Sequence, residues 1–176
     1  MTIDFVNIER VIEDWYGQAT GLKVEWEGAA NTHKQRAYGV MHLNTVKPIG
    51  IDENVTTLDY DQDPGRELVR CTQGNRQFTL VLKVVSRSRR PSESALYYVE
   101  KARTSLSKPS VKADLRAVDV SIARVMDTVF DFHTYQDRDE NWAVLDVIMN
   151  TVVNEIDPRE QGSWIENVEY AGTLYP

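Results

Sequence analysis

The sequence predicts an α+β fold, in which a mostly antiparallel or mixed β-sheet carries two α-helices on one face. Two segments have apolar residues at helical spacing, residues 4–19 and the segment after Pro91 and Ser92. Other segments alternate with a period of two, most clearly residues 77–86 and 142–153, which is typical of β-strands. A chain of 176 residues with both patterns is most simply one domain, residues 1–176.

The first predicted helix is amphipathic. Asp4 or Thr2 can cap its start and Gly21 can end it. Glu13 and Asp14 lie unfavourably near the C-terminal end of this helix, which is the negative end of the helix dipole. A basic residue from elsewhere in the chain can offset them, but the sequence does not identify it. The apolar stripe consists of Phe5, Ile8, Ile12 and Trp15, widened by Val11 and Tyr16.

The second predicted helix has Ser92 as its cap and ends at Pro109. Its apolar stripe is formed by Ala95, Val99, Ala102 and Leu106. Residues 111–117 are ambiguous and are read as a short helical turn.

The remaining regular segments predict strands. Pro48 and Gly50 interrupt one of them, and Gly74 indicates a turn or a bulge. The C-terminal part, residues 118–172, is predicted to be a β-hairpin with a turn at residues 137–141, followed by a short last strand. The other expected strands are residues 23–27, 37–47, 68–72, 77–86, 119–126, 129–135 and 142–153.

Two of these strands, residues 77–86 and 142–153, carry apolar residues on both faces. Such strands are usually covered on both sides. A small chain has few ways to cover a sheet twice, and one of them is a neighbouring subunit.

Residues 52–67 form the most acidic stretch and are read as a long exposed loop or the tip of a hairpin. Asp59, Asp61 and Asp63 are spaced like the start of a calcium-binding loop. However, Pro64 stands where that loop needs glycine, and Arg70 stands where it needs glutamate. A solvated acidic loop is therefore the better interpretation, and no metal site is predicted.

No catalytic or cofactor-binding residues emerge from the sequence, and we expect no enzyme activity. His33, His42 and His133 are far apart, and Cys71 is interpreted as an inert, half-buried thiol. No serine shows a nucleophile-elbow pattern, and no glycine-rich loop suits a phosphate. Pairs of carboxylates for acid–base chemistry stay open, because 27 acidic residues allow many combinations.

The composition of the chain argues against two classes of binding partner, nucleic acids and membranes. The net charge of −7 argues against a role in coating nucleic acid, and no sequence-specific nucleic-acid binding is expected. No run approaches the roughly 20 apolar residues of a membrane span, so no membrane partner is expected. The N-terminus lacks the features of a secretory signal, which predicts a protein that is cytosolic when synthesised.

Charged segments supply candidate contact residues. Arg87, Arg89 and Arg90, next to Lys83, form a basic connector that can meet the acidic loop of another copy in a head-to-tail contact, for example Arg89 with Asp61. The polar loop 157–162 adds Asp157, Arg159 and Glu160. Trp142 and Trp164 are either interface anchors or residues that close the edge of the core.

The order and spacing of these segments resemble the neck and tail terminator proteins of long-tailed bacteriophages. The resemblance covers most of the chain, and it contains no sharp motif from which a binding residue can be transferred. It is carried by the opening helix that ends near Trp15 and Tyr16, the runs 36–43 and 77–85, the helix after Pro91, the segment 138–153 and the closing run 164–168.

The resemblance implies a structural virion protein that forms a hexameric ring on the head-proximal end of the tail tube. Such a ring terminates tube polymerisation and forms part of the head–tail joining interface. The implied partners are copies of itself, the tail tube protein and a head-completion or connector protein, first in the host cytoplasm and then in the virion tail or neck. The alternatives are a head-completion adaptor, a tail tube subunit, or a small α+β enzyme or ligand-binding module.

Overall fold

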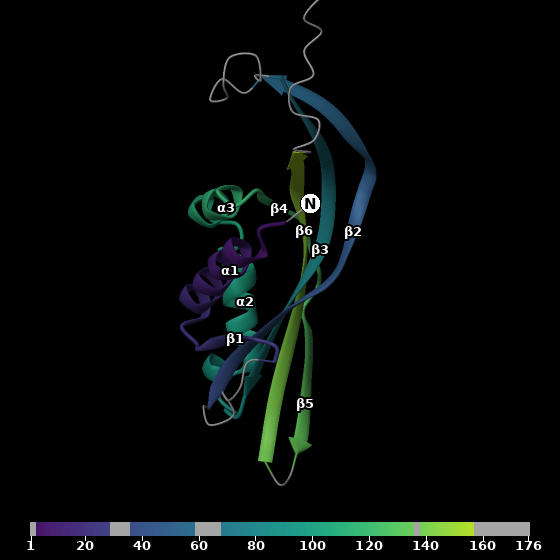
Figure 1. Cartoon of the computed structure of the whole chain (residues 1–176). Helices are drawn as coiled ribbons and strands as arrows, with labels where there is room; N and C mark the ends of the chain where they lie inside the picture. Colours follow the sequence, from purple (N-terminus) through teal and green to yellow (C-terminus); the bar gives the residue numbers. More distant parts are fainter. Residues whose placement is uncertain (1–2, 29–35, 59–67, 136–137, 157–176) are drawn as a thin grey trace, which may run out of the picture.

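The computed structural model describes residues 3–28, 36–58, 68–135 and 138–156, which form a six-stranded sheet with helices against one face (Figure 1). The predicted α+β class and the one-sided packing of the helices are confirmed, with a third helix added. The helices are α1 (Phe5–Thr20), α2 (Ala95–Ser105) and α3 (Pro109–Arg116), with a short 3₁₀ turn η1 (Pro91–Glu93). The strands are β1 (Val24–Trp26), β2 (Ala37–Leu58), β3 (Leu68–Ser86), β4 (Val120–Val125), β5 (Val129–Tyr135) and β6 (Arg138–Ile156).

The strand order is β1-β2-β3-β6-β4, and β5 also pairs with β6. The long strands β2, β3 and β6 are antiparallel neighbours, and β4 and β5 pair antiparallel with successive parts of β6. Among the strands of the described residues, only β1 runs parallel to its neighbour, β2. There the backbone N–H of Gly39 donates to Lys23, and that of Glu27 donates to Met41. The sheet is therefore mostly antiparallel, as predicted.

The first helix matches its prediction at both ends. The Asp4 carboxylate accepts a hydrogen bond from the Asn7 backbone N–H, and Gly21 ends α1 in the left-handed conformation. A basic side chain from α2 does lie at the negative end of α1. The ammonium of Lys101 lies 3.4 Å from the Thr20 carbonyl oxygen, at the negative end of α1.

The core lies between the three helices and the sheet face they cover. Alternate residues of β3 and β6 point into it, because a strand presents every second side chain to the same face. On that face Phe78, Leu80, Leu82 and Val84 of β3 and Ala143, Leu145, Val147 and Met149 of β6 are fully buried. They pack against residues of the predicted helical stripes, including Ile8, Ile12, Trp15, Val99 and Ala102.

The opposite face carries Val81 of β3 and Val144 and Ile148 of β6, all of which are half-buried. Within the described residues all three helices lie on the other side of the sheet (Figure 1). The helices therefore cover only one face, as predicted, and within the described residues no helix of the same chain covers the second face. Coverage by a neighbouring subunit stays a prediction.

Several boundaries differ from the predictions. Residues 52–58 continue β2, which pairs with β3 up to Leu58 and Leu68. For residues 52–58 the predicted hairpin is therefore right and the predicted loop is wrong. Pro109 begins α3 instead of only ending α2, since proline suits the first turn of a helix. β6 starts at Arg138, so residues 138–141, predicted as part of a turn, belong to the strand.

The predicted disturbance at Pro48 and Gly50 is confirmed. Register shifts occur in β2 between Asn44 and Lys47 and between Ile49 and Glu53. Gly50 has a φ of 76°, a conformation that favours glycine. The turn considered at Gly74 is absent, because β3 pairs with β6 in continuous register there, whereas the β2–β3 ladder does have an irregularity opposite Gly74, with the extra residues in β2.

No helix in the described part of the chain is long and apolar enough to cross a membrane.

Candidate functional site

The basic connector follows β3 and is held in a defined conformation by the side chain of Asn141 on β6. Asn141 is buried, its amide oxygen accepts from the Ala95 backbone N–H at 2.7 Å, and its amide nitrogen donates to the Ser88 carbonyl at 2.9 Å. One side chain thus ties the connector to the start of α2. Because all of these groups are buried polar atoms, their hydrogen bonds fix the connector's position.

The charges of the connector are already engaged within the chain. The Arg87 Nε lies 2.7 Å from Glu140, and the Arg90 guanidinium lies 3.8 Å from Glu93. The hydrogen bond from the Ser88 hydroxyl is the main cause that holds the pKa of Glu93 below its ordinary value, and Arg36 and Arg90 add to it. Arg89 is exposed. The connector is therefore an ordered segment with mixed charge rather than a loose basic loop.

The other predicted contact residues, Asp59, Asp61, Asp63, Asp157, Arg159 and Glu160, lie outside the described residues, as does Trp164. The strand ends that flank residues 59–67 are Leu58 and Leu68, whereas the connector begins after Ser86 at the other end of β3. A strand of 19 residues spans about 60 Å at 3.3 Å per residue. Within one chain, the strand ends Leu58 and Leu68, which flank the acidic segment, therefore lie far from the basic connector.

Trp142 lies half-buried on the sheet face without helices. The Lys83 ammonium is 5.6 Å from the centroid of its ring, within the range of a cation–π contact. The neighbouring Tyr38 is buried, and burial raises the pKa of its hydroxyl, with Glu140 contributing in the same direction. These two aromatic residues thus lie near the connector, and the described contacts around them include no reactive group.

The two lateral edges of the sheet are the most unusual feature of the described structure. β1 pairs only with residues 39–41 of β2, so the outer edge of β2 from His42 to Leu58 has no strand partner among the described residues. Pro48 lies in this strand, and proline is tolerated in an edge strand because one side of its backbone is unpaired. β4 and β5 form the opposite edge. Unpaired edges of this length present rows of backbone donors and acceptors to other chains.

Apolar side chains are exposed along both edges. Ile51 on β2 has 92% of its surface accessible, and Phe132 on β5 has 48%. In Figure 1 the hairpin of β2 and β3 reaches past α3, beyond the part of the sheet that the helices cover. The exposed apolar residues on these two strands are Val46, Ile49 and Ile51 of β2 and Val129, Phe130 and Phe132 of β5.

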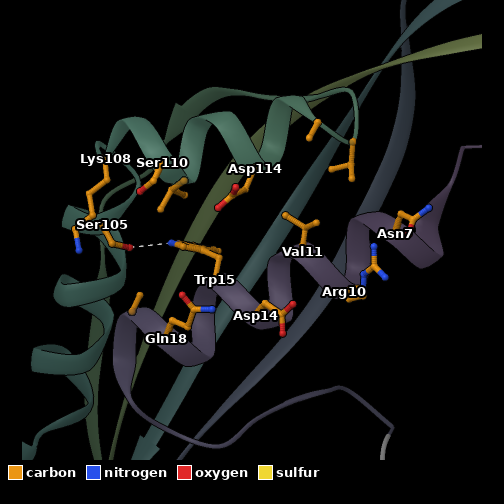
Figure 2. Close-up of a pocket in the computed structure, with 14 residues that line it drawn as sticks. Asn7, Arg10, Val11, Asp14, Trp15, Gln18, Ser105, Lys108, Ser110 and Asp114 are labelled. Atoms are coloured by element: carbon orange, nitrogen blue, oxygen red, sulfur yellow. Dashed lines mark hydrogen bonds between the residues drawn. The ribbon is translucent and has the colours of Figure 1, made fainter.

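A groove of about 680 Å³ lies between α1 and α3. Figure 2 shows Trp15 at one end of it, with the indole N–H donating to the Ser105 hydroxyl at 2.8 Å. Valine and alanine side chains alternate along its walls with charged ones. The groove is lined by Asn7, Arg10, Val11, Asp14, Trp15, Gln18 and Ala19 from α1, by Ser105 and Lys108, and by Ser110, Val111, Asp114, Ala117 and Val118 from α3 and its end.

The described residues offer little reactive chemistry. They contain no group of three or more histidine, cysteine or acidic side chains arranged to hold a metal ion. His42 of β2 lies 3.3 Å from Glu27, and His133 lies in β5. Cys71 is buried, and its sulfur lies 3.5 Å from the Val55 carbonyl oxygen. Ser105 in the groove already bonds Trp15 and the Ala102 carbonyl.

The chain was also compared with known proteins. No protein-family model matches it, and no curated protein is significantly similar to it in sequence.

The sequence reasoning missed two features of this surface. It read residues 111–117 only as a short helical turn and not as the full helix α3, so it did not foresee the groove, although Pro109 before Ser110 and Val111 is a usable helix-start signal. It also treated the long strands as separate short ones, which hid the length of the open β2 edge.

Proposed function

We propose that this protein is a structural virion protein that forms a ring on the head-proximal end of a bacteriophage tail tube. The observation that carries the proposal is the open edge of β2 from His42 to Leu58. A monomer with such an edge is prone to uncontrolled pairing, and association with other subunits removes that hazard. The order and spacing of the segments, which resemble tail terminator proteins, supply the type of assembly.

The proposed mechanism needs no bond-breaking step and no cofactor. One face of a hexameric ring fits the last ring of the tail tube protein, while the opposite face does not repeat that surface, so no further tube subunit adds. This difference in binding between the two faces terminates the tube. The free face then receives a head-completion or connector protein and becomes part of the head–tail joint.

The charge distribution supports contacts between copies rather than within one chain. The strand ends around the acidic segment and the basic connector lie at opposite ends of β3. We propose that Arg89 of one copy meets Asp61 of the next. Arg89→Glu and Asp61→Lys should each weaken assembly, and the double variant should restore it. If neither single change affects assembly, this pairing is wrong.

Light scattering and electron microscopy with purified tail tubes test the function. We expect a discrete hexameric ring that binds one end of each tube and stops further growth. A tail tube subunit would instead polymerise alone at high concentration, and a head-completion adaptor would bind heads without binding tubes. Binding along the whole shaft would overturn the proposal.

Ligand binding is a second candidate function, favoured by the groove between α1 and α3. Its volume of about 680 Å³ falls within the range of small-molecule sites, roughly 300–1,000 Å³. A thermal-shift screen with small molecules tests it, because a ligand that binds only the folded state raises the unfolding temperature. A hit whose effect disappears in Val111→Trp, which fills the groove, would favour this candidate.

A further inference from the structure

The two open edges of the sheet have matching strand directions. β2, β3, β6 and β5 are successive antiparallel neighbours, so β2 and β5 run in opposite directions within one chain. If a second copy is added beside the first in the same orientation, its β2 runs antiparallel to the β5 of the first. The same holds for β4, which also pairs antiparallel with β6. A head-to-tail arrangement therefore continues the sheet antiparallel, with an offset along the strands, because His42–Val55 of β2 lie level with residues 146–156 of β6 whereas β5 lies level with residues 138–144.

Exposed apolar side chains are concentrated on the same two edges. Of the ten large apolar residues that are exposed in the described part of the chain, three lie on β2 and three on β5. Both sets lie on strands whose outer sides have no strand partner for most of their length among the described residues. Exposed apolar residues that gather in this way mark an interaction surface rather than random exposure.

Charged residues on the two edges also complement one another. Toward the hairpin end of the sheet, β2 carries Lys47 opposite Gln77 and then Glu53 opposite Gln73. On the other edge, Asp127 comes just after Met126, whose N–H donates to Asp146 of β6, and Arg124 lies opposite Ile148, closer to the hairpin end. Toward the hairpin end, the β2 edge thus carries first a basic and then an acidic residue. In the same direction, the opposite edge carries first an acidic and then a basic residue. Such complementarity fixes register and partner choice.

From these observations we propose that the open edge of β2 pairs with the β4–β5 edge of a second copy of this chain, which extends the sheet from subunit to subunit. The inference rests on the proposed ring assembly and is an alternative to the Arg89–Asp61 contact, because copies side by side in the same orientation keep the two ends of β3 about 60 Å apart. The contact is heterologous, so each subunit uses one edge to bind a neighbour on each side.

Variants at one edge each test this pairing. Ile51→Lys disables the β2 edge and Phe132→Lys disables the β5 edge, and Val6→Lys, at a residue of α1 that is 77% exposed, is the matched control. In a head-to-tail assembly every interface needs one edge of each kind. Each edge variant should therefore be monomeric by light scattering, whereas Val6→Lys should assemble like the wild type. Circular dichroism and thermal unfolding verify that each variant is folded, and Phe130→Ser replaces Phe132→Lys if the latter is not.

The decisive measurement is the mixture of the two edge variants. An equimolar mixture retains one intact pair of edges, so it should form a heterodimer and stop there. If Phe132→Lys alone assembles like the wild type, the contact joins two β2 edges, and the proposal is overturned. Assembly of both single variants, or a wild type that stays monomeric at all concentrations and with tubes, overturns it too.

Charge reversal gives a second readout. Glu53→Arg should weaken assembly, and Arg124→Glu in the same chain should restore it. Unchanged assembly of both single variants contradicts the proposed register. Heterodimer formation by the variant mixture, together with a wild type that assembles but does not bind tail tubes, would support the edge pairing and reject the terminator function, so the two can fail separately.

Discussion

Arg76 on β3 donates two parallel hydrogen bonds to the carboxylate of Asp52 on β2, Nη1 to Oδ1 and Nη2 to Oδ2, each at 2.6 Å. The pair spans the register shift between Ile49 and Glu53 and crosses directly over Gly74. A Cβ atom at Gly74 would lie 2.2 Å from Oδ1 of Asp52. Gly74 therefore leaves room for this ion pair, which joins the two strands of the hairpin where their ladder is irregular.

Acid should remove the contribution of this pair to stability. The hydrogen bond from Arg76 lowers the pKa of Asp52 in the folded protein below its ordinary value of 3.8. The unfolded state then binds more protons between the two pKa values, so the stabilisation is complete above pH 3.8 and is lost as the pH falls through the folded value. We expect Asp52→Asn to be less stable than the wild type at neutral pH, with the difference vanishing in strong acid. Urea unfolding across pH measures it, and a difference that grows toward acid would contradict it.

Gly74→Ala should act on the same ion pair. The added methyl group displaces the ends of two partly exposed side chains, so the fold should survive and the Asp52–Arg76 bonds should be lost. We expect the destabilisation of Gly74→Ala to be smaller in an Asp52→Asn background than in the wild type, because the pair is already broken there. Equal losses in both backgrounds, from a double-mutant cycle by urea unfolding, would show that Gly74 acts otherwise.

Gly39→Ala should destabilise the core. A Cβ there would lie 2.9 Å from Val24 and 3.0 Å from the Tyr16 ring, which is fully buried and cannot move aside. Overpacking of this kind costs about 1–3 kcal/mol in the free energy of unfolding. Gly17→Ala is the control, because its Cβ meets only ordinary contacts, at 3.6 Å and beyond. Since alanine favours helix over glycine by about 1 kcal/mol, the control should be stabilising. Denaturant titration of both variants gives the opposite signs expected.

Asn141→Ala should loosen the basic connector. The substitution leaves the Ala95 N–H and the Ser88 carbonyl without their side-chain partner, and a buried unsatisfied group costs about 1–3 kcal/mol. We expect a lower unfolding temperature and faster trypsin cleavage after Arg87 or Arg89, since Pro91 blocks cleavage after Arg90. Asn154→Ala, at an exposed position on the same strand, is the control and should change neither. Unchanged cleavage in Asn141→Ala would mean that other contacts hold the connector.

Trp15 and Ser105 should be energetically coupled. Trp15→Phe and Ser105→Ala each remove the hydrogen bond between α1 and the end of α2, which is worth about 1 kcal/mol. The double variant should lose less stability than the sum of the two single losses. Additive losses in denaturant unfolding would show that the bond contributes nothing.

The sequence alone determined the helix–sheet composition of the fold and much of its inward-facing side. Apolar periodicity identified Ile8, Ile12 and Trp15 on one helix and Phe78, Leu80, Leu82 and Val84 on one strand, because burial demands that such residues recur with the period of the element. Capping chemistry located both ends of α1, since Asp4 and Gly21 act within one helical turn. These features depend on neighbours along the chain, which a sequence displays directly.

Tertiary structure alone decided the pairing of the strands and the surfaces that result. The length of the open β2 edge depends on where β1 stops pairing, and the groove depends on the position of α3 beside α1. Neither relation can be predicted from the local sequence. Lys101 reaches Thr20 across 81 positions, and Asn141 reaches Ser88 across 53. Local propensity cannot bring such residues together, because their distance is set by the packing of the helices on the sheet and not by the chain between them.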